Sequence, residues 1–269
     1  MLDCHIHIER GSYMLDWMNE FVKVALERGL DEINLLEHCY RFREFIPMYD
    51  GVCAYSDYID AWFHRKAGVL ELADYLCLVE TVQKQKYPIK INFGLEVCYF
   101  KEFEDLVYKE TKDKGLDFLV GSVHFVDNFA YGHKPEHWDG VDVDKTYRRY
   151  FETSIDLAKS GIYNGIAHPD CIKLFGHKSS FSLLNYYDKF AAELEKNNMY
   201  AEQSGGAHRR CPNTAELGMD NNMLKAMKKH SVNIKTASDA HRPEDVGLYI
   251  AELEKILEDS NEKAKLYGC

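Results

Sequence analysis

Residues 144–170 read DKTYRRYFETSIDLAKSGIYNGIAHPD, a stretch that joins a helical pattern to an extended one. Its apolar side chains recur at helical spacing before Gly161, at Tyr147, Phe151, Ile155 and Ala158. This spacing predicts a helix over Asp144–Ser160 with one apolar face, because glycine commonly follows the last turn of a helix. Ile162–His168 then predicts a short strand that ends on a histidine.

The same alternation of extended runs and helical patterns recurs along the chain. Seven runs have strand character: Leu2–His7, Glu32–Glu37, Ile89–Glu96, Asp117–His124, Ile162–His168, Met199–Gln203 and Asn233–Ala237. Further helical patterns include an apolar stripe that begins at Trp17 and ends before Gly29, and the segments Leu183–Asn197, Ala215–His230 and Val246–Leu257. Such alternation predicts an α/β fold with a mostly parallel sheet. Without a Gly-x-Gly-x-x-Gly motif or a P-loop, a closed (β/α) barrel is favoured over an open, doubly wound sheet.

Composition and charge exclude several functional classes. The chain has 269 residues, 46% of them hydrophobic, so it can bury a sizeable core. A net charge of −11 disfavours nucleic acid or an anionic membrane as a partner. Neither a signal peptide nor an apolar run long enough to span a membrane is visible. The eight cysteines include no Cys-x-x-Cys pair, so we expect reduced thiols and a cytoplasmic location.

Two segments after predicted strands are longer than a barrel requires. His38–Tyr58 is rich in aromatic and arginine residues, and Phe125–Asp142 contains His133, His137 and Trp138. Long segments after strands lie over the catalytic face of a barrel. We therefore expect both to be loops that act as lids or substrate walls.

Residues of metal-ligand type stand at the end of nearly every predicted strand. They are His5, His7, Glu37, His38, Glu96, His124, His168, Asp239 and His241. Taken singly, each histidine is more often structural than a ligand, and a carboxylate such as Glu96 could be a cap or a salt-bridge partner. Together they converge on one face, because the carboxyl ends of barrel strands meet there. Imidazole and carboxylate without thiolate suit Zn, Mn or Fe, and this many side chains exceeds the needs of one ion.

Several of these residues lie in motifs that resemble those of the PHP (polymerase and histidinol phosphatase) family. The matching segments, in order, are Asp3-Cys4-His5-Ile6-His7, Glu37-His38, Gly94-Leu95-Glu96, Gly121-Ser122-Val123-His124, Ala167-His168-Pro169-Asp170 and Ser238-Asp239-Ala240-His241. The resemblance covers nearly the whole chain and is greatest to the stand-alone histidinol-phosphate phosphatases. It implies a distorted (β/α)7 barrel and a single metal-dependent phosphoesterase domain over residues 1–269.

The resemblance also implies two or three divalent metal ions. One would be held by His5, His7, Glu96 and Asp239, and a second by the shared Glu96 with His124 and His168. A third would take His38 and His241. The family usually adds another Asp or His a few residues after His-x-His. This chain has neither there, and Glu9 is the nearest candidate.

A phosphate ester needs cations and a proton source besides metals. The segment Gln203–Arg210 follows the sixth predicted strand, and its glycines beside Arg209 and Arg210 suit a phosphate clamp. Arg10 and Arg242 lie beside ligand motifs and are further substrate-binding candidates. Asp239 or a nearby imidazole such as His208 could protonate the leaving group.

The leading functional prediction is a phosphomonoesterase that hydrolyses L-histidinol phosphate to L-histidinol and phosphate, in histidine biosynthesis. One alternative keeps the site but changes the substrate to a sugar phosphate, a nucleotide or a phosphotyrosine protein. An amidohydrolase and a non-catalytic metal-binding module are further alternatives. The oligomeric state is not predicted.

Overall fold

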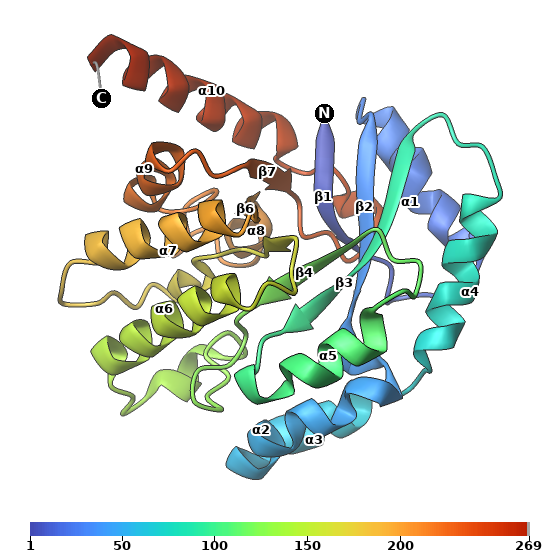
Figure 1. Ribbon diagram of the computed structural model, residues 1–269, viewed down its shortest axis with the longest axis horizontal. Helices are drawn as coiled ribbons and strands as arrows, with labels where there is room; N and C mark the ends of the chain where they lie inside the picture. The colour runs from blue at the N-terminus through green and yellow to red at the C-terminus, as the bar shows by residue number, and fades with distance from the viewer. Residues whose placement is uncertain (268–269) are drawn as a thin grey trace.

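The computed structural model describes the backbone of residues 1–267 and the side chains of residues 1–260. Seven parallel strands form one sheet in which each strand pairs with the next along the chain (Figure 1). They are β1 (Leu2–His7), β2 (Glu32–His38), β3 (Lys90–Cys98), β4 (Phe118–Ser122), β5 (Gly165–Ile166), β6 (Tyr200–Ser204) and β7 (Ile234–Ala237). The strand order confirms the predicted parallel α/β fold.

The sheet closes into a barrel where its first and last strands meet. Ile6 forms a parallel bridge with Ala240, just beyond β7. The N–H of His7 donates to the carbonyl of Ala240 at 2.7 Å. A single bridge replaces a full ladder at this seam, so the barrel is distorted, as the family resemblance implied.

Helices lie around the outside of the strands (Figure 1). The longer ones are α1 (Leu15–Glu27), α3 (Asp57–Lys66), α4 (Leu72–Gln83), α5 (Glu104–Thr111), α6 (Val143–Lys159), α7 (Leu184–Lys196), α9 (Asn221–Lys229) and α10 (Ile250–Tyr267). Two shorter ones are α2 (Asp50–Tyr55) and α8 (Gly206–Arg210). Helix α6 matches its predicted range within one residue at each end and buries Tyr147, Phe151 and Ala158. No helix of the described chain has the length and apolar character needed to cross a membrane.

Three sequence predictions differ from the structure. The segment predicted as the loop His38–Tyr58 is mostly helical, because its apolar residues, among them Phe45 and Met48, are buried against the core. The predicted helix Ala215–His230 begins only at Asn221, where the carboxylate of Asp220 accepts from the N–H groups of Asn222 and Met223. The last predicted helix begins at Ile250 rather than Val246.

Strand β5 is also much shorter than predicted. Only Gly165–Ile166 pairs with its neighbours, whereas the pattern predicted Ile162–His168. A Cβ on Gly165 would lie 2.5 Å from the ring of Tyr200, so only glycine allows this close approach to β6. His168 then turns the chain with a φ of 30°, which ends the extended backbone.

The interior of the barrel is filled at one end by apolar side chains and at the other by polar ones. The apolar set comes from six strands and their ends: Cys4, Leu36, Phe118, Val120, Ala167, Tyr200 and Ala237. A register shift between Asp3 and Ile6 interrupts the β1–β2 ladder. It allows both Cys4 and His5 to face the interior, because a bulge changes the alternation of side chains along a strand.

Candidate metal centre

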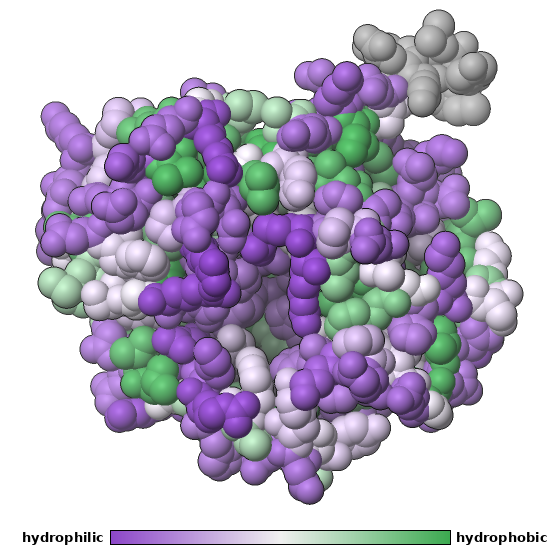
Figure 2. Space-filling view, turned by 180° about the vertical axis from the view of Figure 1, so that it is seen from behind, coloured by the Kyte–Doolittle hydropathy of each residue, from purple (hydrophilic) through white to green (hydrophobic). Residues whose placement is uncertain are grey.

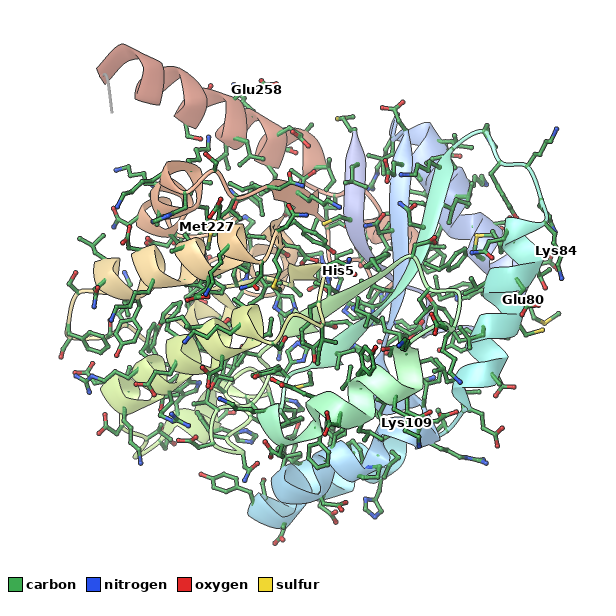
Figure 3. All side chains as sticks on the ribbon, viewed as in Figure 1. His5, Glu80, Lys84, Lys109, Met227 and Glu258 are labelled. Carbon is green, nitrogen blue, oxygen red and sulfur yellow. The ribbon has the colours of Figure 1, made fainter. Side chains whose placement is uncertain are left out.

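Eight of the predicted metal-binding side chains converge at the carboxyl ends of the strands. His5 and His7 end β1, His38 ends β2, Glu96 lies near the end of β3, and the others follow β4, β5 and β7. In Figure 3, His5 lies near the middle of the molecule, whereas the other labelled residues lie on the outer helices. Three groups of three have donor atoms within 4.8 Å of one another: His5, His7 and Glu96; Glu96, His124 and His168; and His7, His38 and His241.

The first group is fully buried. The Nε2 atoms of His5 and His7 lie 2.9 Å apart. Glu96 Oε2 lies 3.8 Å from His5 Nε2 and 3.4 Å from His7 Nε2. Asp239 Oδ1 approaches the same two nitrogens at 3.8 and 3.9 Å. Four donor side chains, from β1, β3 and the segment after β7, therefore face a single point.

The second group uses the other oxygen of the same carboxylate. Glu96 Oε1 lies 3.0 Å from His168 Nε2 and 3.3 Å from His124 Nε2. Glu96 thus directs Oε2 to the first group and Oε1 to the second. A carboxylate in this position can bridge two cations.

The third group is built on stacked rings. The ring of His7 stacks on His38 and on His241 with centroid separations of 4.0 and 4.4 Å, and the rings of His38 and His241 lie 5.8 Å apart. His241 Nε2 lies 3.4 Å from Asp239 Oδ1, and its Nδ1 lies 3.1 Å from Glu9 Oε1. Glu9 therefore contacts the nitrogen of His241 that faces away from Asp239.

The charges of the cluster are set by burial and by the neighbouring groups. Burial disfavours the charge of Glu96, but His124 and the other nearby histidines hold the pKa of this carboxyl well below its usual range. Burial lowers the pKa of His124 to about 3. For His241 burial acts in the same direction, but hydrogen bonds to Asp239 and Glu9 outweigh it and raise the pKa to about 10. Ionised Glu96 beside neutral His124 is the state that binds a cation, whereas His241 must lose its proton before it can bind one.

The donor set fits divalent metal ions. Glu96 Oε2 is buried without a hydrogen bond of suitable geometry, although His38 Nδ1 lies only 2.7 Å away. Two imidazole nitrogens at 2.9 Å likewise need a proton or a cation between them. Histidine and carboxylate donors of this kind suit Zn, Mn or Fe.

A cavity of about 230 Å³ lies against the cluster. Tyr40, Trp62, Phe125 and His133 line it together with His38, His124, His168, Asp239 and His241. Trp62 contacts Tyr40 and His133 edge to face, with centroids 5.2 and 4.8 Å away. Both long segments predicted to form substrate walls therefore contribute aromatic side chains to the cavity.

A wider vestibule adjoins the cavity and is lined by basic side chains. They are Arg10, Arg41, Lys66, Arg209 and Arg210. Figure 2 shows the face of the molecule opposite to that of Figure 1, with hydrophilic side chains around a hollow near its centre. A local cluster of cations favours an anionic ligand despite the net charge of −11.

The other predicted substrate and proton-transfer residues have different surroundings. Arg210 lines both the cavity and the vestibule, and one of its N–H groups donates to the carbonyl of His133. Arg209 pairs with Asp245 at 2.9 Å and donates to the carbonyl of Asp239 at 2.6 Å.

Two candidates lie away from the cavity. His208 Nδ1 bonds the carbonyl of Ala215 at 2.8 Å, and its ring contacts Tyr249. Arg242 is exposed and lies 3.7 Å from a carboxylate oxygen of Glu244. Neither lines the cavity or the vestibule.

Two further carboxylates are buried beside the cluster: Glu202, which sequence reasoning missed, and Glu37, which it counted among the residues of metal-ligand type. Glu202 on β6 is fully buried and bonds His5 Nδ1. Glu37 on β2 is fully buried and accepts from the N–H of Ile8. For Glu202 the available signal was an acidic residue inside a strand whose other residues are mostly apolar. A charge is rarely buried without a partner, so such a residue indicates a buried partner nearby.

The fold and the site define a seven-stranded (β/α) barrel with clustered metal-ligand side chains at the carboxyl ends of its strands. The chain belongs to the PHP domain family, whose model matches residues 3–204.

Related proteins extend this similarity over almost the whole chain. A protein of Deinococcus radiodurans named "Probable histidinol-phosphatase" is 24% identical over 263 residues, which cover 96% of this chain and 93% of that protein. The solved hisK protein of Listeria monocytogenes has a TM-score of 0.72 at 19% identity, over 93% of this chain and 99% of that one. Histidinol phosphate phosphatase of Lactococcus lactis, solved with Zn, L-histidinol and phosphate, has a TM-score of 0.67 at 18% identity, over 94% and 92% of the two chains.

Proposed function

We propose that this protein is a metal-dependent phosphomonoesterase that hydrolyses L-histidinol phosphate. The observation that carries the proposal is Glu96, whose two oxygens face two separate groups of imidazoles. The names of the Deinococcus and Lactococcus proteins support the choice of substrate. The cytoplasmic location stays a prediction.

The proposed ligands follow the three groups of donors. His5, His7, Glu96 and Asp239 would hold one ion, and Glu96, His124 and His168 a second. His38 and His241 would hold a third, with Glu9 either as a direct ligand or as the carboxylate that orients His241. The Lactococcus protein contains Zn, and for this chain we propose two or three ions of Zn, Mn or Fe.

Bound divalent ions would supply Lewis acidity and an activated water. A side chain of the protein must accept the proton of the attacking water and donate one to the leaving oxygen. Asp239 lines the cavity, and although burial disfavours its charge, His241 and His5 hold its pKa below the usual range. As an ionised carboxylate, it can accept the proton of the attacking water and return it to the leaving oxygen.

Arg210 is the phosphate clamp that this geometry supports best. It lines the cavity, and its contact with the carbonyl of His133 orients the guanidinium without neutralising it. Arg209 acts differently, because its bonds to Asp245 and to the carbonyl of Asp239 fix the backbone of the proposed proton carrier. Arg10 lines only the vestibule, where it would attract the substrate.

The aromatic wall would receive the organic part of the substrate. Tyr40 and Trp62 come from the segment after β2, whereas Phe125 and His133 come from the segment after β4. Aromatic side chains can stack on an imidazole or face a cationic amine.

The test is release of inorganic phosphate from L-histidinol phosphate by purified protein loaded with Zn²⁺ or Mn²⁺. We expect saturable release that a chelator abolishes. Absence of release from folded, metal-loaded protein would exclude this substrate. A panel of sugar phosphates, nucleotides and phosphotyrosine peptides, assayed in parallel, would then identify another phosphoester or exclude phosphatase activity.

A further inference from the structure

Glu202 contacts two of the proposed metal ligands but does not line the cavity. It lies on β6 with its side chain fully buried. Its carboxylate bonds His5 Nδ1 at 2.9 Å through Oε1 and at 3.1 Å through Oε2. Oε2 also accepts the backbone N–H of His168 at 3.1 Å. One side chain therefore contacts both the first and the second group of donors.

The contact with His5 fixes the position of the proton on its ring. A carboxylate only accepts hydrogen bonds, so the Nδ1 that faces it must carry the proton. The lone pair of the neutral ring is then on Nε2, the atom that lies 2.9 Å from His7 Nε2 and 3.8 Å from Glu96 Oε2. Glu202 thus selects the tautomer in which His5 can bind a cation at the shared point.

The contact with His168 compensates for the short β5. That strand ends at Ile166, two residues before His168, and His168 adopts a φ of 30° that is unusual for a residue other than glycine. Its N–H donates to the side chain of Glu202 rather than to a strand carbonyl. This bond holds the turn that directs His168 Nε2 to Glu96 Oε1, at 3.0 Å.

We propose that Glu202 is a positioning residue that prepares both metal sites at once. It sets the tautomer of His5 for one site and the backbone turn of His168 for the other. The proposal rests on the metal-dependent function proposed above, but its test is metal binding by the protein rather than turnover.

Substitution Glu202→Gln tests this role with almost no change in volume. The amide has one oxygen and one NH2 group, so it places a donor either at the position of Oε2, 3.1 Å from the backbone N of His168, or at that of Oε1, 2.9 Å from His5 Nδ1. If its oxygen accepts from His5, the NH2 group faces the N–H of His168, and two donors oppose each other. In the reverse orientation the NH2 group donates to Nδ1 and moves the ring proton to Nε2, where it blocks metal binding.

The measurement is Zn²⁺ titration of metal-free protein in competition with a chromogenic chelator. We expect Glu202→Gln to weaken both of the tight Zn²⁺ binding steps by about 10- to 100-fold, the usual effect of losing an outer partner of a metal ligand. Glu32→Gln is the matched control, because Glu32 is a carboxylate at the start of β2 that bonds Lys90 and Asn92. It should bind Zn²⁺ as the unmodified protein does. Equal Zn²⁺ affinity in Glu202→Gln and the unmodified protein would overturn the proposal.

A second measurement needs no variant. Nitrogen NMR of histidine in the Zn²⁺-loaded, unmodified protein should show His5 with its proton on Nδ1 and Zn²⁺ on Nε2. A proton on Nε2 would overturn the proposal even if Glu202→Gln failed to fold. Failure of the proposed function would give a different result. If Glu202→Gln weakened Zn²⁺ binding as expected but the unmodified protein released no phosphate from L-histidinol phosphate, only the proposed substrate would be contradicted.

Discussion

At the scale of single residues, Glu96 decides how many cations the site can hold. Its side chain is buried, and each of its oxygens faces a different group of imidazoles. A histidine in its place would offer one lone pair to one ion, whereas a carboxylate offers oxygens to two. The separation of the two groups therefore depends on one side chain.

Substitution Glu96→Ala should remove the shared donor from both groups. We expect phosphate release to fall by more than about 100-fold, beyond the usual effect of losing only an outer partner. Bound metal, measured by elemental analysis after desalting, should fall as well. Glu80→Ala on α4 is the control, because Glu80 is exposed and pairs with Lys84 on the surface. Full metal content in Glu96→Ala would contradict the assignment.

A comparison of variants at Arg210 and Arg242 tests whether Arg210 binds the phosphate or is only a surface charge. Loss of a hydrogen bond to a charged group costs about 1.5–3 kcal/mol. We therefore expect Arg210→Ala to lower kcat/KM for a phosphomonoester by about 10- to 150-fold. Arg242→Ala removes the same charge outside the cavity and should leave kcat/KM nearly unchanged. Similar kinetics in the two variants would exclude Arg210 as the clamp.

At the scale of elements, the start of α8 positions Asp239. A Cβ on Gly206 would lie 2.6 Å from the Cβ of Asp239, whereas on Gly205 its nearest contact would be the ring of Tyr249 at 3.2 Å. Gly206→Ala should therefore displace Asp239 and weaken both Zn²⁺ binding and turnover by 10-fold or more, on the order expected for a displaced outer partner. Gly205→Ala, the adjacent control, should change both much less. The two variants can be compared by Zn²⁺ titration.

Helix α3 carries Trp62 into the cavity, and its role can be tested with two substrates. An aromatic contact contributes about 0.5–1.5 kcal/mol beyond burial. Trp62→Ala should thus raise KM for L-histidinol phosphate by about 2- to 10-fold. KM for O-phosphoethanolamine, which lacks the imidazole, should stay the same. Tyr55→Ala is the control, since Tyr55 is 60% exposed on α2 and does not line the cavity. Equal shifts for both substrates would argue against imidazole recognition.

The sequence predicts elements well where one residue pattern determines them. The strands that carry His5 and Glu96, and the strand that precedes Asp239, are predicted correctly because buried strands read as short apolar runs. Strand β5 was overestimated, because Gly165 and the turn at His168 depend on contacts with β6 that no local pattern contains. Glu202 was missed for the same reason, since its partners lie 197 and 34 residues away in the chain. Residue types at strand ends predicted which side chains converge, but not which of them orient the others.

At the scale of the whole molecule, the cluster joins parts of the chain that are otherwise weakly tied. The seam between β1 and β7 has a single bridge, and β5 has two residues. The proposed ligands come from β1, β2 and β3 and from the segments after β4, β5 and β7. Bound ions would therefore crosslink these strands and segments at the carboxyl end of the barrel.

Metal removal should for this reason destabilise the entire fold. An ion at 100 times its dissociation constant stabilises the folded state by about 2.7 kcal/mol. In a domain of this size each kcal/mol shifts Tm by about 2–4 °C, so chelation should lower Tm by about 5–10 °C. Calorimetry of the loaded and the chelated protein measures the shift. His5→Ala, which lacks a ligand of the first group, should show a smaller shift on chelation. If chelation left Tm of the unmodified protein unchanged, the ions would not hold the barrel ends together. Closure would then rest on the Ile6–Ala240 bridge, on side-chain hydrogen bonds across the seam such as that from the Ser238 N–H to Asp3, and on the surrounding helices.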